Sequence, residues 1–232
     1  MTVESVEPRA VRRRPALSRR EVLTVALRLI DSDGVEALSM RRLGKALDRD
    51  PMRLYRFADS KDALLDGVVE LVLEELVVPE VPGGDWQDVL RGAAHGFRRL
   101  ALAHPNVVPL LVTRPLATPL GLRPAGTLRP LESLLELLIG AGFDERAALH
   151  GYRLYTGFLY GFVLTELQER VSAPDETDAL LRLGLHRLPA REFPRLRGLA
   201  TELASFDGER ELDEGLEIIV EGLRRRLGPA GT

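Results

Sequence analysis

Apolar residues recur at three- and four-residue steps along most of the chain, which is the period of an amphipathic helix. A first long helix is predicted from one such stripe, formed by Val22, Val25, Ala26, Leu29 and Ile30. It opens with the capping-box pattern Ser18-x-x-Glu21 and is expected to end at Gly34. The sequence shows no sign of a β-sheet, so the expected fold class is all-α.

Residues 39–57 have the pattern of two short helices joined by a tight turn. The first covers residues 39–47, with an inner face expected to hold Leu43, Ala46 and Leu47. Residues 48–50 are too polar for the core and are predicted to form the turn. Asp50 is a good N-cap and Pro51 a good first residue for a second helix over Met52–Phe57. This is the arrangement of a helix-turn-helix, whose second helix enters the major groove of DNA.

Several further helices are predicted after this motif. One runs from Lys61 to about Val77, with Ser60 as its cap and an inner face of Leu64, Leu65, Val68, Val69 and Val72. Prolines and glycines over 79–84 mark a domain boundary, after which Asp85 caps a helix that begins at Trp86. Its inner face is expected to hold Val89, Leu90, Ala93, Phe97 and Leu100.

The prolines of residues 104–130 predict only a short helix near 107–112, with a longer one over 131–140. The longest pattern extends over 144–171 and is apolar nearly all round, which predicts burial on both sides. Residues 173–208 are expected to form loops with short helical turns, and residues 209–227 a last helix. The predicted organisation is a disordered basic arm (1–17), a DNA-binding domain (18–78) and a C-terminal domain (79–232).

Charge is unevenly distributed over the 232 residues, although the net charge is only -3. Residues 1–61 hold 14 basic against 9 acidic residues, whereas the rest holds 18 against 26. A basic N-terminal quarter suggests that this end approaches a polyanion, but chance alone could produce it. The absence of cysteine, of a signal-peptide pattern and of an apolar run near ~20 residues predicts a cytoplasmic protein without membrane contact.

The ordered residues around the helix-turn-helix carry a family signature. They are Gly34-Val35, Leu38, Leu43, Leu54-Tyr55-x-Phe57, Lys61 and Leu64-Leu65. Over roughly residues 18–78 this pattern resembles the DNA-binding domain of the TetR family of repressors. The departure is the turn, where Asp48 and Arg49 replace the usual glycine and apolar residue. Asp tolerates the left-handed conformation, and Arg49 is expected to stay out of the core and to add a phosphate contact.

Eight residues are candidate DNA contacts: Ser39, Arg41, Pro51, Met52, Arg53, Tyr55, Arg56 and Lys61. Arginine can bond guanine O6 and N7 bidentately, and Pro51 or Met52 can touch a thymine methyl. The resemblance implies phosphate contacts by Tyr55 and Lys61. The alternative is a solvated basic face with a core tyrosine. For the arm, which carries Arg9, Arg12, Arg13 and Arg14, DNA contact and a solvated tail are both open.

A second stretch, roughly residues 86–169, resembles the ligand-binding domain of the tetracycline repressors. The matching residues are Trp86-Gln87, Leu90-Arg91, Phe97-Arg98-Arg99 and Thr113-Arg114-Pro115. The resemblance implies an effector pocket lined by Phe97, Leu111, Tyr155, Phe158 and Phe162, with plain hydrophobic core as the alternative. Residues 108–112 lack the histidine that a drug–magnesium complex requires in those repressors, so we do not expect tetracycline sensing.

Catalytic, cofactor and metal motifs are not apparent. The four histidines lack zinc spacing, no nucleophile elbow or phosphate loop occurs, and the carboxylates are expected on solvated helix surfaces.

We expect a homodimeric repressor, released from a palindromic operator on double-stranded DNA by a small apolar ligand, with residues 144–171 and 209–227 forming an intersubunit bundle. The alternatives are an activator, a ligand-independent repressor, or a helical binding or enzymatic protein with a vestigial DNA-binding domain.

Overall fold

The computed structural model describes residues 17–76, 85–117, 119–170 and 184–227, which are helical without a strand. In chain order the helices are α1 (Arg19–Asp33), η1 (Val35–Ala37), α2 (Met40–Leu47), η2 (Pro51–Arg56), α3 (Lys61–Leu73), α4 (Trp86–Ala103), α5 (Val108–Ala117), η3 (Leu120–Leu122), α6 (Ala125–Gly140), α7 (Glu145–Arg170), η4 (Leu185–Arg187), α9 (Pro194–Gly198), α10 (Ala200–Ala204) and α11 (Gly208–Arg226). The all-α prediction is therefore confirmed for these ranges. The basic arm and the boundary segment 79–84 lie outside them.

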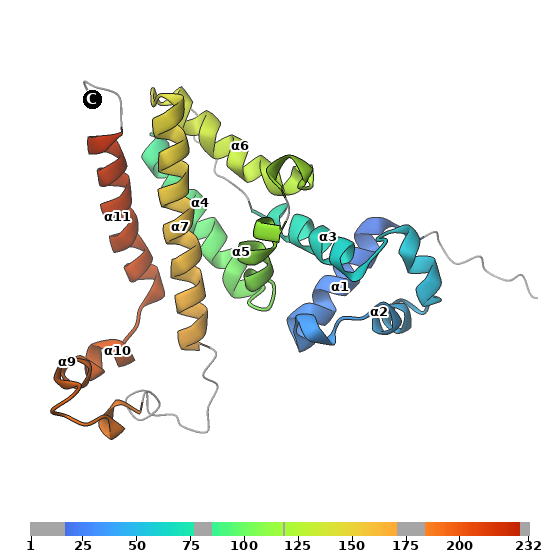
Figure 1. The fold of residues 1–232 in the computed structure, drawn as a ribbon, viewed down its shortest axis with the longest axis horizontal. Coiled ribbons are helices and arrows are strands. Elements are labelled where there is room, and N and C mark those ends of the chain that lie inside the picture. The colour runs from blue at the N-terminus through green and yellow to red at the C-terminus, as the bar shows by residue number, and fades with distance from the viewer. Residues whose placement is uncertain (1–16, 77–84, 118, 171–183, 228–232) are drawn as a thin grey trace, which may run out of the picture.

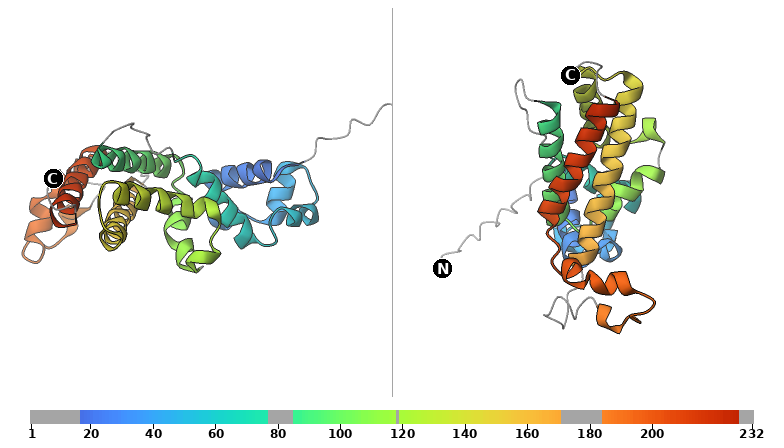
Figure 2. Two further views of the ribbon diagram at one scale, coloured as in Figure 1. Left: turned by 90° about the horizontal axis from the view of Figure 1, so that it is seen from above. Right: turned by 90° about the vertical axis from the view of Figure 1, so that its left-hand side faces the viewer.

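The elements occupy an elongated arrangement (Figures 1 and 2). Helices α1, α2 and α3 lie together at one end, and α7 and α11 lie side by side at the other. Helices α4, α5 and α6 lie between these ends, and one continuous set of buried apolar residues extends from α1 to α11. In the part of the chain that the structure describes, no helix is both long and apolar enough to span a membrane.

Helix α1 forms as its capping pattern predicts. The Ser18 hydroxyl accepts the Glu21 amide N–H at 3.2 Å, and the Glu21 carboxylate accepts the Ser18 amide N–H at 2.7 Å. Gly34 ends the helix with φ +80°, a conformation that favours glycine. The predicted inner residues of α3 are all buried, but the helix ends at Leu73 rather than extending toward residue 77.

The expectation that prolines divide residues 104–130 into short pieces is wrong. Helix α5 continues to Ala117 through Pro115, and α6 begins at Ala125, six residues before the predicted start, with Pro130 inside it. A proline costs a helix one hydrogen bond, and tertiary contacts can offset this. The start of α6 is held by such a contact, because the Gly126 N–H donates to Glu70 Oε1 at 3.2 Å.

The long C-terminal helices agree with the predicted spans. The Asp144 carboxylate caps α7 by accepting the Ala147 N–H at 2.7 Å, and Asp207 caps α11. Short helical turns occupy 184–206, as expected, while 173–183 lie outside the described ranges. The predicted burial of α7 on both sides is wrong for a single chain, since Leu149 and Leu154 are exposed.

Candidate nucleic-acid interface and the residues behind it

The helix-turn-helix begins with α2, which Ser39 caps by accepting the Arg42 N–H at 3.2 Å. The turn after α2 depends on Asp48, whose φ of +51° places it in the left-handed region. The Arg49 amide N–H donates to the carbonyl of Gly44 at 2.9 Å, which closes the helix end. The turn is therefore formed without glycine, as predicted, and the half-buried Arg49 directs its guanidinium to the Asp48 carbonyl at 3.1 Å.

Gly44 permits the close approach of α2 and η2. A Cβ at this position would lie 2.9 Å from the Arg49 carbonyl oxygen and 3.0 Å from Pro51 Cγ. Helical spacing alone gives no sign of this requirement. The prediction that Ala46 lies on the inner face is wrong, because Ala46 is exposed. The inner face of α2 instead carries Leu43 and Gly44, which are buried, with Leu47 half-buried one turn later.

The predicted second helix of the motif is present as a 3-10 helix, η2. The Asp50 carboxylate accepts the Met52 N–H at 2.9 Å, so the predicted cap is confirmed. A 3-10 helix has three residues per turn, which places residues 51, 54 and 57 on one side. Of these, Leu54 is completely buried.

The other side of η2 faces solvent. Met52 is 72% exposed and Tyr55 is 40% exposed, which argues against the alternative of a core tyrosine. Arg53 and Arg56 are also exposed, and the Arg56 guanidinium lies 4.5 Å from the centroid of the Phe57 ring. The motif thus presents two guanidinium groups, one phenol and one thioether from a short rigid segment.

Further candidate contacts flank this helix. Ser39 and Arg41 are exposed at the start of α2, and Pro51 is half-buried at the start of η2. Lys61 is the half-buried first residue of α3, whose N-cap Ser60 accepts the Ala63 N–H at 3.0 Å. An ammonium beside free helix amides is suited to binding phosphate oxygens. All eight predicted DNA contacts therefore belong to the start of α2, the helix η2 and the start of α3.

The five residues expected to bind an effector lie on α4, α5 and α7. Phe97, Leu111 and Tyr155 are buried, whereas Phe158 and Phe162 are half-buried with ring centroids 6.0 Å apart. The Tyr155 hydroxyl donates to the Leu90 carbonyl at 2.7 Å, and burial raises the pKa of this phenol. Tyr155 is therefore a neutral donor that joins α7 to α4.

Two features of this region were not identified from the sequence. Tyr160 lies 5.5 Å, between ring centroids, from Phe97, and burial raises the pKa of Tyr160 to about 12. The carboxylate of Glu166 is 1% exposed and forms a bidentate ion pair with Arg98, at 2.9 Å to Nε and 2.8 Å to Nη2. The expectation that carboxylates lie on solvated surfaces is thus wrong for Glu166. Its spacing from Tyr155, Leu159 and Val163 along one stripe of α7 was the available signal.

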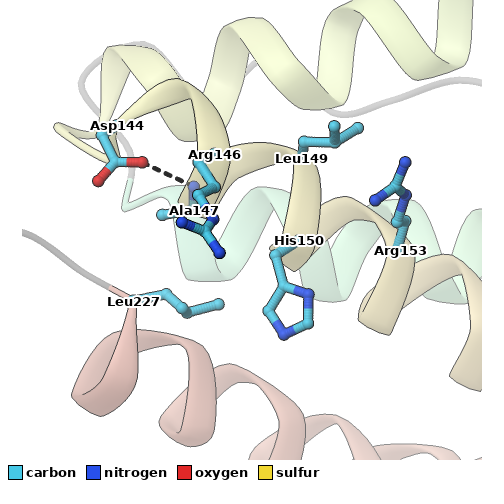
Figure 3. A pocket seen from close by; sticks show the side chains of 7 residues that line it. All are labelled: Asp144, Arg146, Ala147, Leu149, His150, Arg153 and Leu227. Carbon is cyan, nitrogen blue, oxygen red and sulfur yellow. Dashed lines mark hydrogen bonds between the residues drawn. The ribbon is translucent and has the colours of Figure 1, made fainter.

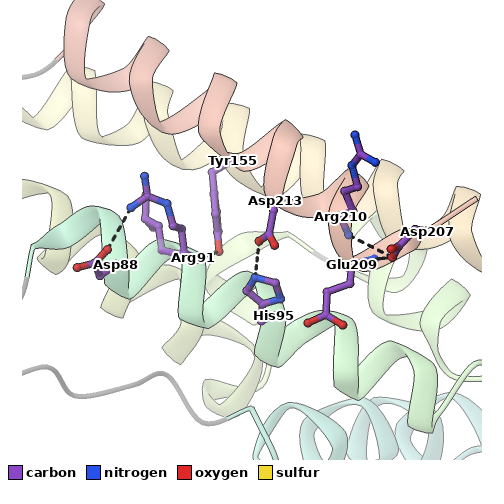
Figure 4. Close-up of polar contacts among 9 residues, drawn as sticks. Asp88, Arg91, His95, Tyr155, Asp207, Glu209, Arg210 and Asp213 are labelled. Carbon is purple, nitrogen blue, oxygen red and sulfur yellow. Dashed lines mark hydrogen bonds and ion pairs between the residues drawn. The ribbon is translucent and has the colours of Figure 1, made fainter.

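Helix α4 also contacts α11 through the side chains of His95 and Asp213 (Figure 4). His95 Nε2 lies 2.8 Å from Asp213 Oδ1, close to the Tyr155 ring that points between the helices. This contact joins α11 to α4, the helix that also carries Phe97.

Ion pairs connect α3 with the helices behind it. Arg114 on α5 contacts Asp66 at 2.6 Å and Asp62 at 3.2 Å, and it also donates to the Asp62 carbonyl at 2.9 Å. His104, after α4, lies 2.9 Å from Asp31 at the end of α1, and the Asn106 amide donates to the Asp31 carbonyl at 3.0 Å. Helix α3 is therefore tied to α5, and helix α1 to the segment that follows α4.

An exposed recognition helix on a buried leucine, attached to a larger helical unit, defines a helix-turn-helix DNA-binding protein. The family described as "Tetracyclin repressor-like, C-terminal domain" matches residues 78–227. The chain therefore belongs to the TetR family of transcriptional regulators.

Relatives and solved structures agree with this assignment. An HTH-type transcriptional regulator of Saccharopolyspora erythraea is 31% identical over 219 residues, which cover 94% of this chain and 89% of the relative. The class D tetracycline repressor of Escherichia coli is 29% identical over 220 residues, 91% of each chain. The structure of the Streptomyces coelicolor TetR family protein ActR in complex with actinorhodin has a TM-score of 0.73 at 31% identity. It covers 90% of this chain and 97% of ActR.

Proposed function

We propose that this protein is a homodimeric transcriptional repressor, released from a palindromic DNA operator when a small, largely apolar molecule binds its C-terminal domain. On this proposal the protein acts in the cytoplasm, and it acts by binding and not by catalysis. The DNA-binding domain ends at residue 78, and the C-terminal domain begins at residue 79. The observation that carries the proposal is the surface of η2, where Met52, Arg53, Tyr55 and Arg56 face solvent around the buried Leu54.

On this proposal, base recognition and phosphate contact are made by different residues. Arg53 and Arg56 can each present two donors to a guanine edge, and Met52 supplies an apolar contact to a thymine methyl. Tyr55, Lys61, Ser39 and Arg41 bind the backbone and fix the orientation of η2 in the groove. A two-fold dimer presents two such helices to half-sites one helical turn apart, which requires a palindromic operator.

Support for an effector comes from the interior of the C-terminal helices and from relatives. Phe97, Leu111 and Tyr155 on three different helices belong to the same buried apolar set, with Phe158 and Phe162 packed against it. A pocket that opened among these side chains would favour an apolar ligand with few polar groups. The ActR structures contain actinorhodin and (S)-DNPA. Because residues 108–112 lack histidine, we do not propose tetracycline as the ligand.

The contacts of Arg114 suggest how an effector would act on DNA binding. Leu111 and Arg114 lie one turn apart on α5, and Arg114 contacts Asp62 and Asp66 in α3, the helix that starts with Lys61. A ligand that displaces Leu111 would therefore move the first turn of α3. Release requires that the ligand bind the displaced state more tightly than the DNA-bound state.

The experiment that tests this function is selection of bound sequences from a random duplex pool at near-physiological salt. We expect enrichment of one inverted repeat and a steep fall of log K with log salt. Arg53→Ala should relax base preference by about 1–3 kcal/mol at one position, whereas Lys61→Ala should weaken all duplexes alike. Arg195→Ala, an exposed arginine on α9, is the matched control and should change neither.

Two results would contradict the proposal. A folded protein that enriches no sequence would exclude a sequence-specific regulator. Equal losses on all duplexes for Arg53→Ala and Lys61→Ala would show that η2 does not read bases. The enriched operator then serves as the probe in a screen for the effector, which is recognised by its ability to release the complex.

A further inference from the structure

Acidic side chains form a ridge along α3, at the junction with the C-terminal helices. Asp62, Asp66, Glu70 and Glu74 recur every four residues, so they follow one another along the helix and its last turn. A hollow of about 480 Å³ lies elsewhere, because the residues that line it come from around the start of α7 and the end of α11 (Figure 3). The ridge, unlike the hollow, belongs to a helix that supports the helix-turn-helix.

Glu70 joins three helices through a single carboxylate. Its Oε1 accepts the backbone N–H of Gly126, the second residue of α6, at 3.2 Å. Its Oε2 lies 3.4 Å from Nη1 of Arg19, the first residue of α1. Helix α3 packs against both of these helices (Figure 1). The half-buried Glu70 side chain is therefore the point at which α1, α3 and α6 meet.

Helix α6 takes an N-terminal cap from α3 and not from its own sequence. The residue before α6 is Pro124, whose side chain cannot accept a hydrogen bond, and no local side-chain cap is formed there. The first N–H groups of a helix need acceptors, and a carboxylate also interacts favourably with the positive end of the helix dipole. Glu70 provides both. A Cβ at Gly126 would lie 2.4 Å from Glu70 Cγ, so this close approach requires glycine.

The contacts on the ridge hold α3 at two separate points. Arg114 on α5 contacts Asp62 and Asp66 near the start of the helix. Glu70 lies eight residues after Asp62, which places it about 12 Å further along the helix axis. A rigid helix that is held only at its start can pivot about that point, and a second contact removes this freedom. Because α1 and α3 pack on each other, the direction of α3 also sets the direction of the helix-turn-helix.

We infer that Glu70 is a positioning residue, which fixes the direction of the DNA-binding helices on the C-terminal helices and thereby sets the spacing of the operator half-sites. The inference rests on the proposed function and adds a determinant of its specificity. In a two-fold dimer, both copies of η2 fit one spacing only if each DNA-binding domain has a fixed direction. One added base pair changes the separation of the half-sites by ~3.4 Å and their relative rotation by roughly 34°. Domains that pivot tolerate this change, whereas fixed domains do not.

Operator spacing is the measurement that distinguishes positioning from stability. The probes are the duplex enriched in the selection and two derivatives, with one base pair inserted or removed between the half-sites. Fluorescence anisotropy measures the dissociation constant of each duplex for the wild type, Glu70→Ala, Gly126→Ala and the double variant. The matched control is Glu74→Ala, which removes another ion pair between α3 and α1, with Arg20, but leaves the cap of α6 in place. Thermal unfolding establishes that each variant is folded.

We expect the wild type and the Glu74→Ala control to bind both derivatives at least about tenfold more weakly than the enriched duplex, a loss similar to that for a mismatched base pair. In Glu70→Ala and Gly126→Ala this difference should fall to about threefold or less, because α3 can then pivot about Arg114. The double variant should match Glu70→Ala, since removal of the Glu70 side chain leaves room for the added methyl group.

The contact itself can be measured without DNA. Hydrogen exchange of the Gly126 amide should be at least about tenfold faster in Glu70→Ala than in the wild type, because this N–H loses its acceptor. The Glu74→Ala control should leave the exchange rate unchanged. A rate in Glu70→Ala equal to that of the wild type would overturn the inference.

The results on DNA separate this inference from the proposed function. Folded Glu70→Ala and Gly126→Ala proteins that discriminate spacing as strongly as the wild type would overturn only the role of Glu70, however large their losses on all three duplexes. An equal relaxation in Glu74→Ala would also overturn it, because the cap of α6 would then not be the cause. A wild-type protein that enriches no duplex would overturn the proposed function together with the role of Glu70 in spacing.

Discussion

The ion pair between Arg98 and Glu166 allows a quantitative test of how the C-terminal helices are held together. The side chains are 11% and 1% exposed, and both carboxylate oxygens accept hydrogen bonds from the guanidinium. The carboxylate raises the pKa of Arg98 above its ordinary value. Glu166→Gln keeps the shape of the side chain but removes its charge, which leaves a guanidinium without its counter-ion between α4 and α7.

Removing one partner of a buried pair costs about 3–5 kcal/mol, because the other charge stays desolvated. The free energy of unfolding of a typical domain is only about 5–15 kcal/mol, so the loss is a large fraction of it. For a chain of this length about 1 kcal/mol lowers Tm by roughly 2–4 °C. We therefore expect Glu166→Gln to lower Tm by about 6–20 °C.

Urea and thermal unfolding, followed by circular dichroism, measure this change. The double variant Arg98→Met/Glu166→Met removes both charges and should recover most of the stability, because apolar replacements of a buried ion pair are often neutral. Arg224→Met is the control: its pair with Glu221 lies on the surface of α11, and little change is expected. A Glu166→Gln variant as stable as the wild type, or a double variant less stable than either single one, would refute the reasoning.

Three other predictions follow from local geometry. Gly44→Ala should destabilise the protein by about 1–3 kcal/mol and weaken operator binding, since its Cβ would displace the turn before η2. Ser18→Ala should lower the free energy of unfolding by about 1 kcal/mol, because the cap of α1 is lost. Hydrogen bonds from the Ser18 amide and hydroxyl hold the pKa of Glu21 below its ordinary value of 4.5, so the substitution should also raise this pKa, which NMR titration measures. Arg114→Met should leave operator affinity within about tenfold but reduce release by the effector, because the link from α5 to Asp66 is lost.

Each of these predictions has a contradicting result. Unchanged operator affinity in Gly44→Ala would show that α2 and η2 need not approach so closely. Because folding lowers the pKa of Glu21, its ionised carboxylate stabilises the folded protein at pH values above the unfolded-state pKa. This stabilisation is lost as the pH falls through the folded-state pKa. A Glu21 titration unaffected by Ser18→Ala would show that the hydroxyl contributes nothing. Full release from Arg114→Met by the effector would exclude coupling through this arginine.

Local signals in the sequence were sufficient for most of the helices and for the residues of η2 that face solvent. Capping residues such as Ser18, Asp50 and Ser60 act within one turn, so their effect can be recognised from spacing alone. The same is true of the stripe of α3, because a helix with one apolar side must bury that side. The resemblance to the TetR family also predicted how the helices are arranged in space, which the period of the apolar residues cannot predict.

Contacts between distant residues decided the features that the sequence did not reveal. Pro130 suggested a break, but the contact of Gly126 with Glu70 holds the start of α6 in place. The 3-10 geometry of η2, the need for glycine at position 44 and the burial of Glu166 all depend on atoms brought together from other elements. Helix propensity and charge are properties of a residue, whereas close approach and desolvation exist only between packed elements, and these required the tertiary structure.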